Sequence, residues 1–385
     1  MREIKSKIKL EKIVYKSDAS QISGEVAEVI FPKTAEEIVE IVKTKQNIVP
    51  RGGGTGLVGG AVPLNSTIVD LSKMDKILNI DKENKVAEVE TGVILENLNI
   101  ELARFGLEFP IDPSSAKSCT IGGMIACNAV GKRAVNYGRT SDWIKEIELI
   151  NGKGEIIKLG KLNISDVAGF EGLTGIILKA KLNLSHLKIR TLNLLKINNI
   201  EKIPEIIKNL KLNKEVCGIE ILDKITSRIL GLPEIYHLIV EYESDVGEFK
   251  GEKYKKIMDL RDSAYPKLAQ EGFTHIEDPK VLMFKLPQII HYLEKNKIPF
   301  FGHIGVGIIH PCFKPEQKKE IEDLLNYVKK LSGQITGEHG IGLLKKKFIE
   351  PNDKRLFLNI KKRYDPEFKL NPSKIIDKNN EQTIN

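Results

Sequence analysis

The segment from Pro50 to Ala61, PRGGGTGLVGGA, is the strongest constraint on how this chain can fold. It holds six glycines in the nine positions from Gly52 to Gly60. Ordering a glycine costs more backbone entropy than ordering any other residue, so this density is typical of a backbone that approaches a ligand closely or takes positive φ angles. Successive N–H groups in such a turn form an anion-binding concavity, and Arg51 adds a permanent positive charge. We expect a phosphate group to bind here.

The glycine-rich segment superficially matches two nucleotide-binding motifs. Gly54, Gly56 and Gly59 have the spacing G-x-G-x-x-G, which binds dinucleotides when a helix begins directly after the turn. Here Pro63 disfavours a helix, and residues 67–71 are typical of a β-strand. A P-loop is excluded because no Gly-Lys-Ser/Thr ends the segment. The sequence therefore predicts a phosphate-binding turn of another kind.

Length, net charge and the distribution of apolar residues limit the class of protein. The chain has 385 residues, enough for two or three domains, and a net charge of +8. No aromatic and basic patch accompanies that charge, so we expect no nucleic-acid partner. There is no apolar run long enough to span a bilayer, and the Lys-rich N-terminus lacks the apolar core of a signal peptide. We expect a cytoplasmic protein and leave peripheral association with an anionic membrane open.

Cysteine spacing excludes several kinds of metal and redox site. The chain has four cysteines and no C-x-x-C pair. This excludes a zinc-finger pattern, a thioredoxin-like motif and a cysteine-bound iron–sulfur cluster. We expect buried, reduced cysteines.

Apolar periodicity and turn residues predict a mixed chain of helices and strands. Thr34 and Glu37 form a capping box ahead of an apolar helical face, and the sequence NGKG at residues 151–154 predicts a hairpin. We expect helices at residues 35–43, 93–105, 203–210, 254–261 and 316–331. We expect strands at residues 47–50, 67–71, 85–90, 144–150, 155–159, 217–222 and 237–242.

Two further glycine-rich segments follow, at residues 120–131 and 169–177. Strands separate them from the first segment, which indicates one cofactor site built from several loops. The set resembles the flavoproteins related to vanillyl-alcohol oxidase, whose FAD domain is of the PCMH type. The motifs that carry the resemblance are Pro50 to Ala61, Asp112-Pro113-Ser114-Ser115, Thr120-Ile121-Gly122-Gly123 with Asn128, Tyr137-Gly138-Arg139-Thr140, and Gly169 to Ile177.

This resemblance implies FAD as cofactor. Members that attach FAD covalently through the first loop carry a histidine near its end, where this chain has Gly54-Thr55-Gly56, so we expect non-covalent FAD. The residues implied to bind FAD are Pro50, Arg51, Gly52, Gly53, Gly54, Thr55, Gly56, Leu57, Pro113, Ser114, Thr120, Gly122, Gly123, Asn128, Gly131, Tyr137, Gly138, Glu171, Gly172, Gly175, Ile177 and Asn371.

A second constellation, HIGVGIIH, places His303 and His310 seven residues apart. In a regular strand an odd separation puts side chains on opposite faces. A bend at Gly305 or Gly307 would let both rings converge on one metal ion. The alternative is a structural role for each histidine. A third motif, TGEHGIG, begins at Thr336.

These two motifs, with the ending LNPSK at residues 370–374, resemble the D-2-hydroxy-acid dehydrogenases. That subfamily includes D-lactate dehydrogenase, D-2-hydroxyglutarate dehydrogenase and the glycolate oxidase flavin subunit. The resemblance implies a divalent metal, Zn²⁺ or Mn²⁺, whose ligands are His303, His310 and Glu338.

The resemblance also implies the residues that handle the substrate. His339 would face the flavin as the base. Arg261 would pair with the substrate carboxylate, and its alternative is an exposed helix arginine. Val306 and Ile308 stand where the subfamily has Asp and Asn, which leaves the particular 2-hydroxy acid open.

We therefore expect FAD-dependent oxidation of a D-2-hydroxy acid, such as D-lactate or glycolate, to the 2-oxo acid. Two alternatives remain. One is an oxidase of another alcohol, or an enzyme similar to alkyl-glycerone-phosphate synthase. The other is a flavin subunit that relays electrons within a larger complex.

The fold class expected is α+β. A two-lobed PCMH-type FAD domain would cover residues 1–182, an antiparallel-sheet (ferredoxin-like) substrate or cap domain residues 183–335, and a segment packing back near the flavin residues 336–385. Without an iron–sulfur cluster of its own, the chain needs an external electron acceptor. A quinone, a cytochrome, an electron-transfer flavoprotein, a partner subunit and O₂ all fit, and homodimerisation stays open.

Overall fold

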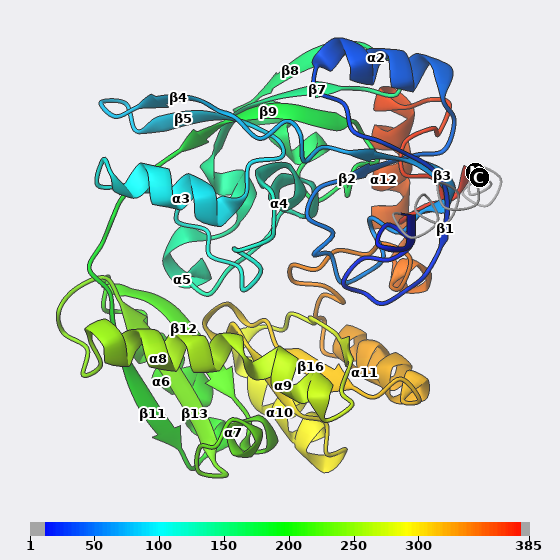
Figure 1. The fold of residues 1–385 in the computed structure, drawn as a ribbon. Helices are drawn as coiled ribbons and strands as arrows, with labels where there is room; N and C mark the ends of the chain where they lie inside the picture. Colours follow the sequence, from blue (N-terminus) through cyan, green and yellow to red (C-terminus); the bar gives the residue numbers. More distant parts are fainter. Residues whose placement is uncertain (1–11, 379–385) are drawn as a thin grey trace, which may run out of the picture.

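A computed structural model describes residues 12–378. Two bodies lie one above the other in Figure 1. We call the upper one the N-terminal unit and the lower one the cap unit. Among residues 12–378, no helix has the length and apolar character that a membrane crossing requires.

A small parallel sheet carries the first glycine-rich loop. Its strands are β1 (Glu25–Ile30), β2 (Ile48–Arg51) and β3 (Leu64–Asp70), in the order β1-β3-β2. The loop leaves β2 and enters β3 directly, so the prediction that no helix follows the glycines is confirmed.

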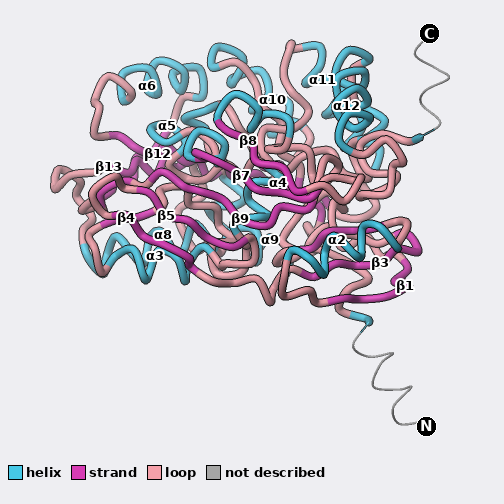
Figure 2. Tube along the Cα trace, turned by 90° about the horizontal axis from the view of Figure 1, so that it is seen from above, coloured by secondary structure: helices cyan, strands magenta, loops and turns pink. Residues whose placement is uncertain are grey.

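Helix α2 (Ala35–Thr44) covers the parallel sheet, as Figure 2 shows. Thr34 caps its first turn, because the threonine Oγ1 accepts the backbone N–H of Glu37 at 3.3 Å. Ile38 and Val42 are fully buried in one core cluster with Ile48 of β2. The capping box and the apolar face predicted this helix to within one residue of its observed end.

A larger antiparallel sheet forms the centre of the N-terminal unit. Its strands are β4 (Ile77–Asp81), β5 (Val86–Glu90), β7 (Ile144–Ile150), β8 (Ile156–Gly160) and β9 (Ile176–Asn183). They lie in the order β4-β5-β9-β7-β8. Further helices of this unit are α3 (Leu95–Ala103), α4 (Ile121–Cys127) and α5 (Ala134–Tyr137). Apolar side chains of β5, β7 and α3 share one core with those of α4, which the sequence analysis missed.

The cap unit is built on an antiparallel sheet. Its strands are β11 (Thr191–Ile197), β12 (Val216–Leu222), β13 (Tyr236–Tyr242), β14 (His275–Ile276), β15 (Phe300–Gly302) and β16 (His310–Phe313). They lie in the order β11-β13-β12-β15-β16-β14. The α+β fold and the antiparallel cap sheet are confirmed.

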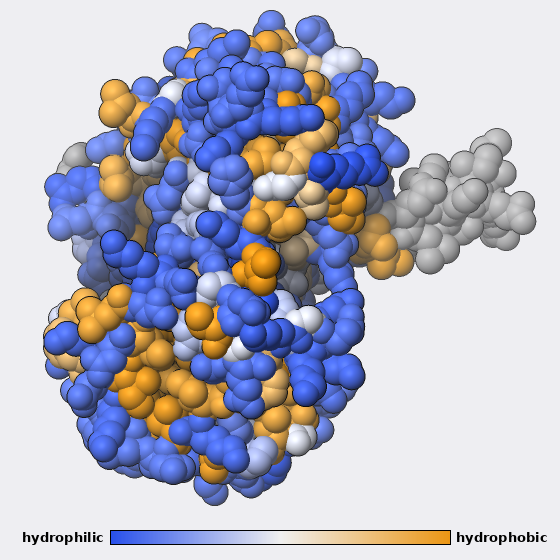
Figure 3. All heavy atoms as spheres, turned by 90° about the vertical axis from the view of Figure 1, so that its left-hand side faces the viewer, coloured by the Kyte–Doolittle hydropathy of each residue, from blue (hydrophilic) through white to orange (hydrophobic). Residues whose placement is uncertain are grey.

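Helices cover both faces of the cap sheet. They are α6 (Ile203–Leu210), α7 (Lys224–Ile229), α8 (Gly251–Asp262), α9 (Ala264–Gln270), α10 (Leu286–Lys295) and α11 (Lys318–Lys330). Along β13, Leu238 and Val240 face the core shared with α6, α10 and α11, and Ile239 faces the core shared with α8 and α9. Because successive side chains of a strand point to opposite faces, β13 contributes apolar side chains to both cores. Hydrophobic side chains also gather on the lower half of the face in Figure 3.

The chain changes sheet between β10 (Ser185–His186), which pairs with β6 (Leu107–Glu108), and β11. The domain boundary near residue 182 stays a prediction. After the cap, α12 (Pro351–Tyr364) returns to the N-terminal unit in Figure 1, and Leu370 forms a parallel bridge to Ile48.

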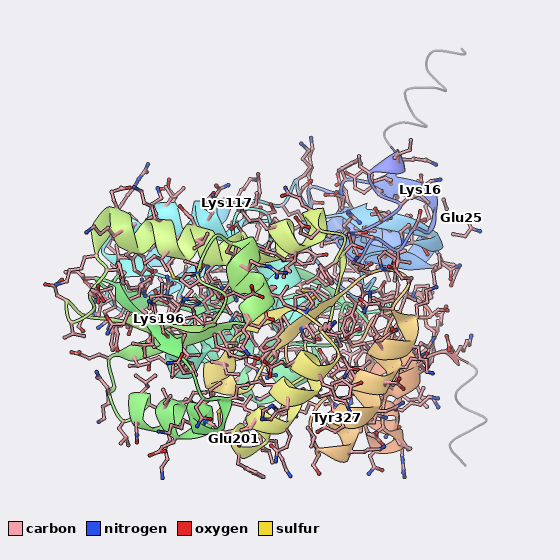
Figure 4. All side chains as sticks on the ribbon, turned by 90° about the horizontal axis from the view of Figure 1, so that it is seen from below. Lys16, Glu25, Lys117, Lys196, Glu201 and Tyr327 are labelled. Atoms are coloured by element: carbon pink, nitrogen blue, oxygen red, sulfur yellow. The ribbon has the colours of Figure 1, made fainter. Side chains whose placement is uncertain are left out.

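A cluster of charged residues joins the two units. Lys132 and Arg133 of the N-terminal unit lie beside Asp112, with Nζ and Nη2 at 3.4 Å and 3.2 Å from its Oδ2. They reach across to the cap, where Lys132 Nζ lies 2.7 Å from Asp262 and Arg133 Nε 3.0 Å from Glu241. By contrast, charged side chains such as Lys117 lie on the exposed rim of the molecule in Figure 4.

Replacing Asp112 by Asn should destabilise the fold in a pH-dependent way. Burial alone would raise the pKa of Asp112, but Arg133 and Lys132 outweigh it and lower that pKa to about 2. A depressed carboxyl pKa stabilises the fold fully above the unfolded-state value near 3.9 and loses that effect as the pH falls through 2. We expect wild type to exceed Asp112→Asn by about 2 kcal/mol in unfolding free energy at pH 6.

Urea unfolding between pH 2 and pH 7 measures this difference. It should shrink steadily below pH 4. Asp323→Asn, at an exposed position on α11, is the matched control. A difference between wild type and Asp112→Asn that stays constant down to pH 2 would contradict the charge pairing.

Candidate active site

A cavity of about 620 Å³ is lined by residues of both units. The first glycine loop, residues 113–123 and residues 171–177 line one part, and residues of the cap and of the loop after it line the other. The predicted cofactor-binding residues that line it are Pro50, Arg51, Gly52, Gly53, Gly54, Thr55, Gly56, Leu57, Pro113, Ser114, Thr120, Gly122, Gly123, Glu171, Gly172, Gly175 and Ile177. The predicted residues outside this lining are Asn128, Gly131, Tyr137, Gly138 and Asn371.

The first loop needs glycine for two reasons. Side chains at some positions would clash with neighbouring residues, and one position has a backbone angle that other residues rarely adopt. A Cβ on Gly53 would lie 2.0 Å from the carbonyl oxygen of Ser118, and one on Gly52 would lie 2.3 Å from Thr120 Oγ1. Gly54 has φ +66°, where L side chains are strained. The loop backbone is therefore pressed against residues 118–120, and its glycines line the cavity together with Thr55 and Leu57.

The side chain of Arg51 packs between Tyr15 and the glycine loop. Its guanidinium lies over the ring of Tyr15 at 5.4 Å, and a Cβ on Gly54 would meet its Nη2 at 2.4 Å. Burial lowers its pKa, while Asp18 and Asp70 oppose that shift. Arg51 therefore supplies a buried positive charge beneath the loop and not a freely exposed one.

Thr120 caps a helix that begins beside the loop. Its Oγ1 accepts the backbone N–H of Gly123 at 3.2 Å, and α4 follows. Asn128 ends the helix in the left-handed region at φ +50°. Threonine before the apolar run of residues 121–127 was the available sequence signal for this helix.

Glu171 connects the cavity to the C-terminal part of the chain. Its carboxylate accepts the backbone N–H groups of Ile341 at 2.6 Å and Gly342 at 3.0 Å. Burial raises the pKa of Glu171 to about 7 against the effect of these donors. Asn371 Nδ2 donates to the carbonyl oxygens of Gly60 at 2.9 Å and Glu171 at 2.5 Å. Asn371 thus joins two cofactor loops from outside the lining.

The structure brings His303, His310 and Glu338 together at the cavity wall. One ligand atom from each lies within 4.8 Å of the others. His310 Nε2 is 3.2 Å and His303 Nε2 is 3.5 Å from the Glu338 carboxylate. The predicted bend exists as a 3₁₀ turn at Ile304–Val306, followed by Gly307 at φ +80°. The bend lets two rings at an odd separation face one point.

The charges of these groups are strongly coupled. Burial would lower the pKa of His303, but Glu220 and Glu338 raise it to about 9. Burial lowers the pKa of His310. The pKa of Glu338 falls well below its usual range because His303 and hydrogen bonds from all three imidazoles outweigh burial. His310 Nδ1 is buried without a hydrogen-bond partner within residues 12–378.

His339 lies next to this cluster. Its ring stacks on that of His310, with centroids 5.1 Å apart and planes 12° apart. Its Nε2 lies 3.3 Å from Glu338 Oε1 and its Nδ1 lies 3.6 Å from Asp278 Oδ1. His339 also lines the cavity, so the imidazole faces both the ligand space and the acidic cluster.

Asp278 fixes the loop that carries Glu338 and His339. Its Oδ2 accepts the backbone N–H groups of Gly337, Glu338 and His339 at 2.7 to 2.9 Å, and the hydroxyl of Thr336 at 2.8 Å. Burial would raise the pKa of Asp278, but His339 and Lys345 outweigh it and lower that pKa to about 2. Sequence reasoning missed Asp278, because Asp278-Pro279 belongs to no recognised motif and its partners lie about 60 residues later.

Arg261 reaches the same cavity from α8 and is only 2% exposed, so the alternative of an exposed helix arginine is wrong. Its Nε donates to Glu220 Oε2 at 2.7 Å and its Nη1 to Ser114 Oγ at 2.7 Å. Its Cζ lies 5.2 Å from the Phe301 ring centroid.

The two apolar departures from the dehydrogenase motif lie outside the cavity lining. Ile308 is buried in a small cluster with Val130 and Ala134 of the N-terminal unit, and Val306 packs against it. These positions therefore contribute to the contact between the two units.

Comparisons with known proteins agree on both units. Residues 26–160 match the FAD binding domain family, and residues 244–375 match the FAD linked oxidases, C-terminal domain. Glycolate oxidase subunit GlcD of Bacillus subtilis is 30% identical, over 95% of this chain and 93% of that protein. D-lactate dehydrogenase of Archaeoglobus fulgidus is 29% identical over 91% of each.

Two further proteins are similar to this chain, one in sequence and one in fold. D-2-hydroxyglutarate dehydrogenase of Stutzerimonas stutzeri is 25% identical over 90% of each chain. The fold is similar to that of alkyldihydroxyacetonephosphate synthase, with a TM-score of 0.66 at 15% identity, over 90% of this chain and 76% of that one. The chain belongs to the FAD-linked oxidases with a PCMH-type FAD-binding fold.

Proposed function

We propose that this protein oxidises a small D-2-hydroxy acid, of the D-lactate or glycolate kind, to the corresponding 2-oxo acid. One observation carries the proposal: His303, His310, Glu338, His339 and Arg261 all line the cavity that the glycine loop also lines. A group that can take a proton, a set of metal ligands and a carboxylate-binding cation thus share one space with the FAD cradle.

The glycine loop fits FAD because Gly52, Gly53 and Gly54 bring consecutive backbone units to the cavity and Arg51 supplies a positive charge beside them. Its backbone N–H groups would hold the pyrophosphate. Bound FAD supplies the acceptor for the hydride that leaves the substrate carbon. No histidine stands at Gly54-Thr55-Gly56, which supports non-covalent binding.

A divalent metal fits the donor set of His303, His310 and Glu338. Two imidazoles and one carboxylate with open positions suit Zn²⁺ or Mn²⁺. The imidazoles of His303 and His310 and the carboxylate of Glu338 form a compact donor set on the cavity wall. The cation would supply polarisation of the hydroxyl oxygen.

His339 takes the hydroxyl proton of the substrate as the C–H bond breaks, and the carbonyl of the 2-oxo acid forms. Histidine is the side chain that most often serves as a general base in enzymes. Arg261 binds the substrate carboxylate with the N–H groups that Glu220 and Ser114 leave free. Tyr265, Ile276 and Phe301 line the same cavity and favour a small, partly apolar substrate.

The electrons leave to an external acceptor: a quinone, a cytochrome, an electron-transfer flavoprotein or a partner subunit. We place the protein in the cytoplasm, with association at a membrane surface as one route to a quinone. A homodimer is compatible with this role. The proposed segments are a FAD domain to residue 182, a cap to residue 335 and a returning segment to residue 385.

A second candidate is a flavin subunit that relays electrons within a complex. The name of one relative, a glycolate oxidase subunit, favours it. Two other candidates are oxidation of another alcohol and chemistry like that of the alkyldihydroxyacetonephosphate synthase. The similarity of fold is their only support.

Anaerobic bleaching of the flavin tests the proposed reaction directly. D- and L-lactate, glycolate, D-2-hydroxyglutarate and ethanol are each mixed with the purified protein, with and without prior chelation. We expect rapid bleaching by D-lactate or glycolate, little by ethanol, and a loss on chelation that Zn²⁺ or Mn²⁺ restores. Bleaching by none of the hydroxy acids would contradict the reaction and favour the relay role.

Replacing His339 by Ala should lower the rate of flavin reduction by roughly 10²–10⁴-fold, because the hydroxyl proton loses its acceptor. Stopped-flow absorbance at saturating substrate measures this rate. His291→Ala on the outer face of α10, where the imidazole is 54% exposed, is the matched control. A rate near that of wild type in His339→Ala would refute the assignment of the base.

Replacing Gly53 by Ala should reduce the flavin content of the purified protein, because the added Cβ meets Ser118 at 2.0 Å. Gly160→Ala is the control, since a Cβ at Gly160 meets nothing within 4 Å. The ratio of flavin to protein absorbance reports the content. Equal ratios in the two variants would show that close packing of the loop is unnecessary for FAD binding.

A further inference from the structure

Glu220 lies in the middle of β12, where it is 2% exposed. Its Oε1 lies 2.7 Å from His303 Nδ1, and its Oε2 accepts Arg261 Nε at 2.7 Å. Arg261 Nη2 also forms an ion pair with Oε2. One carboxylate therefore holds two residues of the site, although Glu220 itself does not line the cavity.

The contact with His303 decides how that imidazole can act. Glu220 forms an ion pair with Arg261, and a carboxylate can only accept hydrogen bonds. His303 Nδ1 must then carry the proton. The lone pair of a neutral ring is left on Nε2, which faces Glu338 Oε2 at 3.5 Å. A cation between them needs this tautomer, and a ring fixed by its outer nitrogen binds metal best.

The contact with Arg261 decides where that guanidinium lies. Glu220 accepts a hydrogen bond from Nε on one edge of the planar guanidinium, and Ser114 Oγ accepts one from Nη1 at 2.7 Å. The Phe301 ring lies 5.2 Å from Cζ and limits movement on one face. With these partners the arginine cannot rotate away from the cavity, and its remaining N–H groups have a fixed direction.

We propose that Glu220 is a positioning residue that couples the metal site to the site for the substrate carboxylate. It holds the imidazole of His303 with Nε2 directed at the cation and the guanidinium of Arg261 at the cavity. This role rests on the proposed function. Because a single carboxylate joins both partners, its replacement disturbs metal binding and substrate binding together.

Replacement by Gln tests the coupling. A glutamine puts an NH₂ donor in place of one of the two oxygens that now face His303 Nδ1 and Arg261 Nε, so one of these two contacts is lost. We expect the dissociation constant for Zn²⁺ or Mn²⁺, measured by equilibrium dialysis, to rise 10- to 100-fold. We also expect KM for D-lactate to rise by a larger factor than kcat falls, measured with the metal site saturated, while the flavin content stays at the wild-type level.

Glu108→Gln is the matched control, because Glu108 is also buried, at 5% exposed, and ion-paired with Arg190, and it lies outside the cavity lining. Glu220→Asp keeps the charge on a shorter side chain, so we expect it to restore part of the metal affinity. If Glu220→Gln does not fold, Glu220→Asp carries the test, with a dissociation constant between those of wild type and His303→Ala expected.

The outcomes separate this role from the proposed reaction. Wild-type metal affinity in Glu220→Gln, or equal losses in Glu220→Gln and Glu108→Gln, would overturn the positioning role. So would wild-type affinity in Glu220→Asp if only that variant folds. Wild-type protein that binds no cation would overturn the metal site and this role with it. Metal binding that depends on Glu220, without bleaching by any hydroxy acid, would support the role and refute the reaction.

Discussion

The pairing of buried charges between the two units is the interaction on which the site depends. Lys132 is 5% exposed in its side chain and lies between Asp112 and Asp262, and Arg133 lies between Asp112 and Glu241. A buried charge without its partner is strongly destabilising. The cap unit is therefore held in the orientation in which its carboxylates meet these cations. That orientation brings Arg261, which is adjacent to Asp262, against Ser114 of the N-terminal unit.

Buried charges are also paired within the cavity wall. Glu338 is surrounded by imidazoles, Glu220 lies between His303 and Arg261, and Asp278 accepts hydrogen bonds from the loop that carries Glu338. Each carboxylate is desolvated, and each has a positively charged or N–H partner that keeps it ionised. This compact arrangement of acidic groups and imidazoles is the basis for the proposed cation site and the proposed base, His339.

Local patterns predicted a large part of this molecule. The capping box at Thr34 predicted α2, and period-two alternation predicted β5. Pro63 excluded a helix after the glycine loop, and β3 is found there. Glycines between two histidines indicated the bend that brings His303 and His310 together. These features could be predicted because their causes lie within about ten residues of sequence.

Contacts between distant parts of the chain could not be predicted in this way. Glu220 and His303 are 83 residues apart, Asp278 and His339 are 61 apart, and Glu171 and Ile341 are 170 apart. Glu220 sits in an apolar run that indicates only a buried strand. Lys345 begins a basic run, yet it is 1% exposed because Glu277 and Asp278 surround it.

The sequence by itself determined the FAD-binding family, because backbone close to a phosphate requires glycine at successive positions whatever the rest of the fold does. It also determined which side chains could carry the chemistry, since only certain residue types bind metals and accept protons. The tertiary structure alone decided which carboxylate lies behind each imidazole and guanidinium. Those pairings arise where β12, α8 and β15 meet at the junction of the two units, and burial there makes each contact strong.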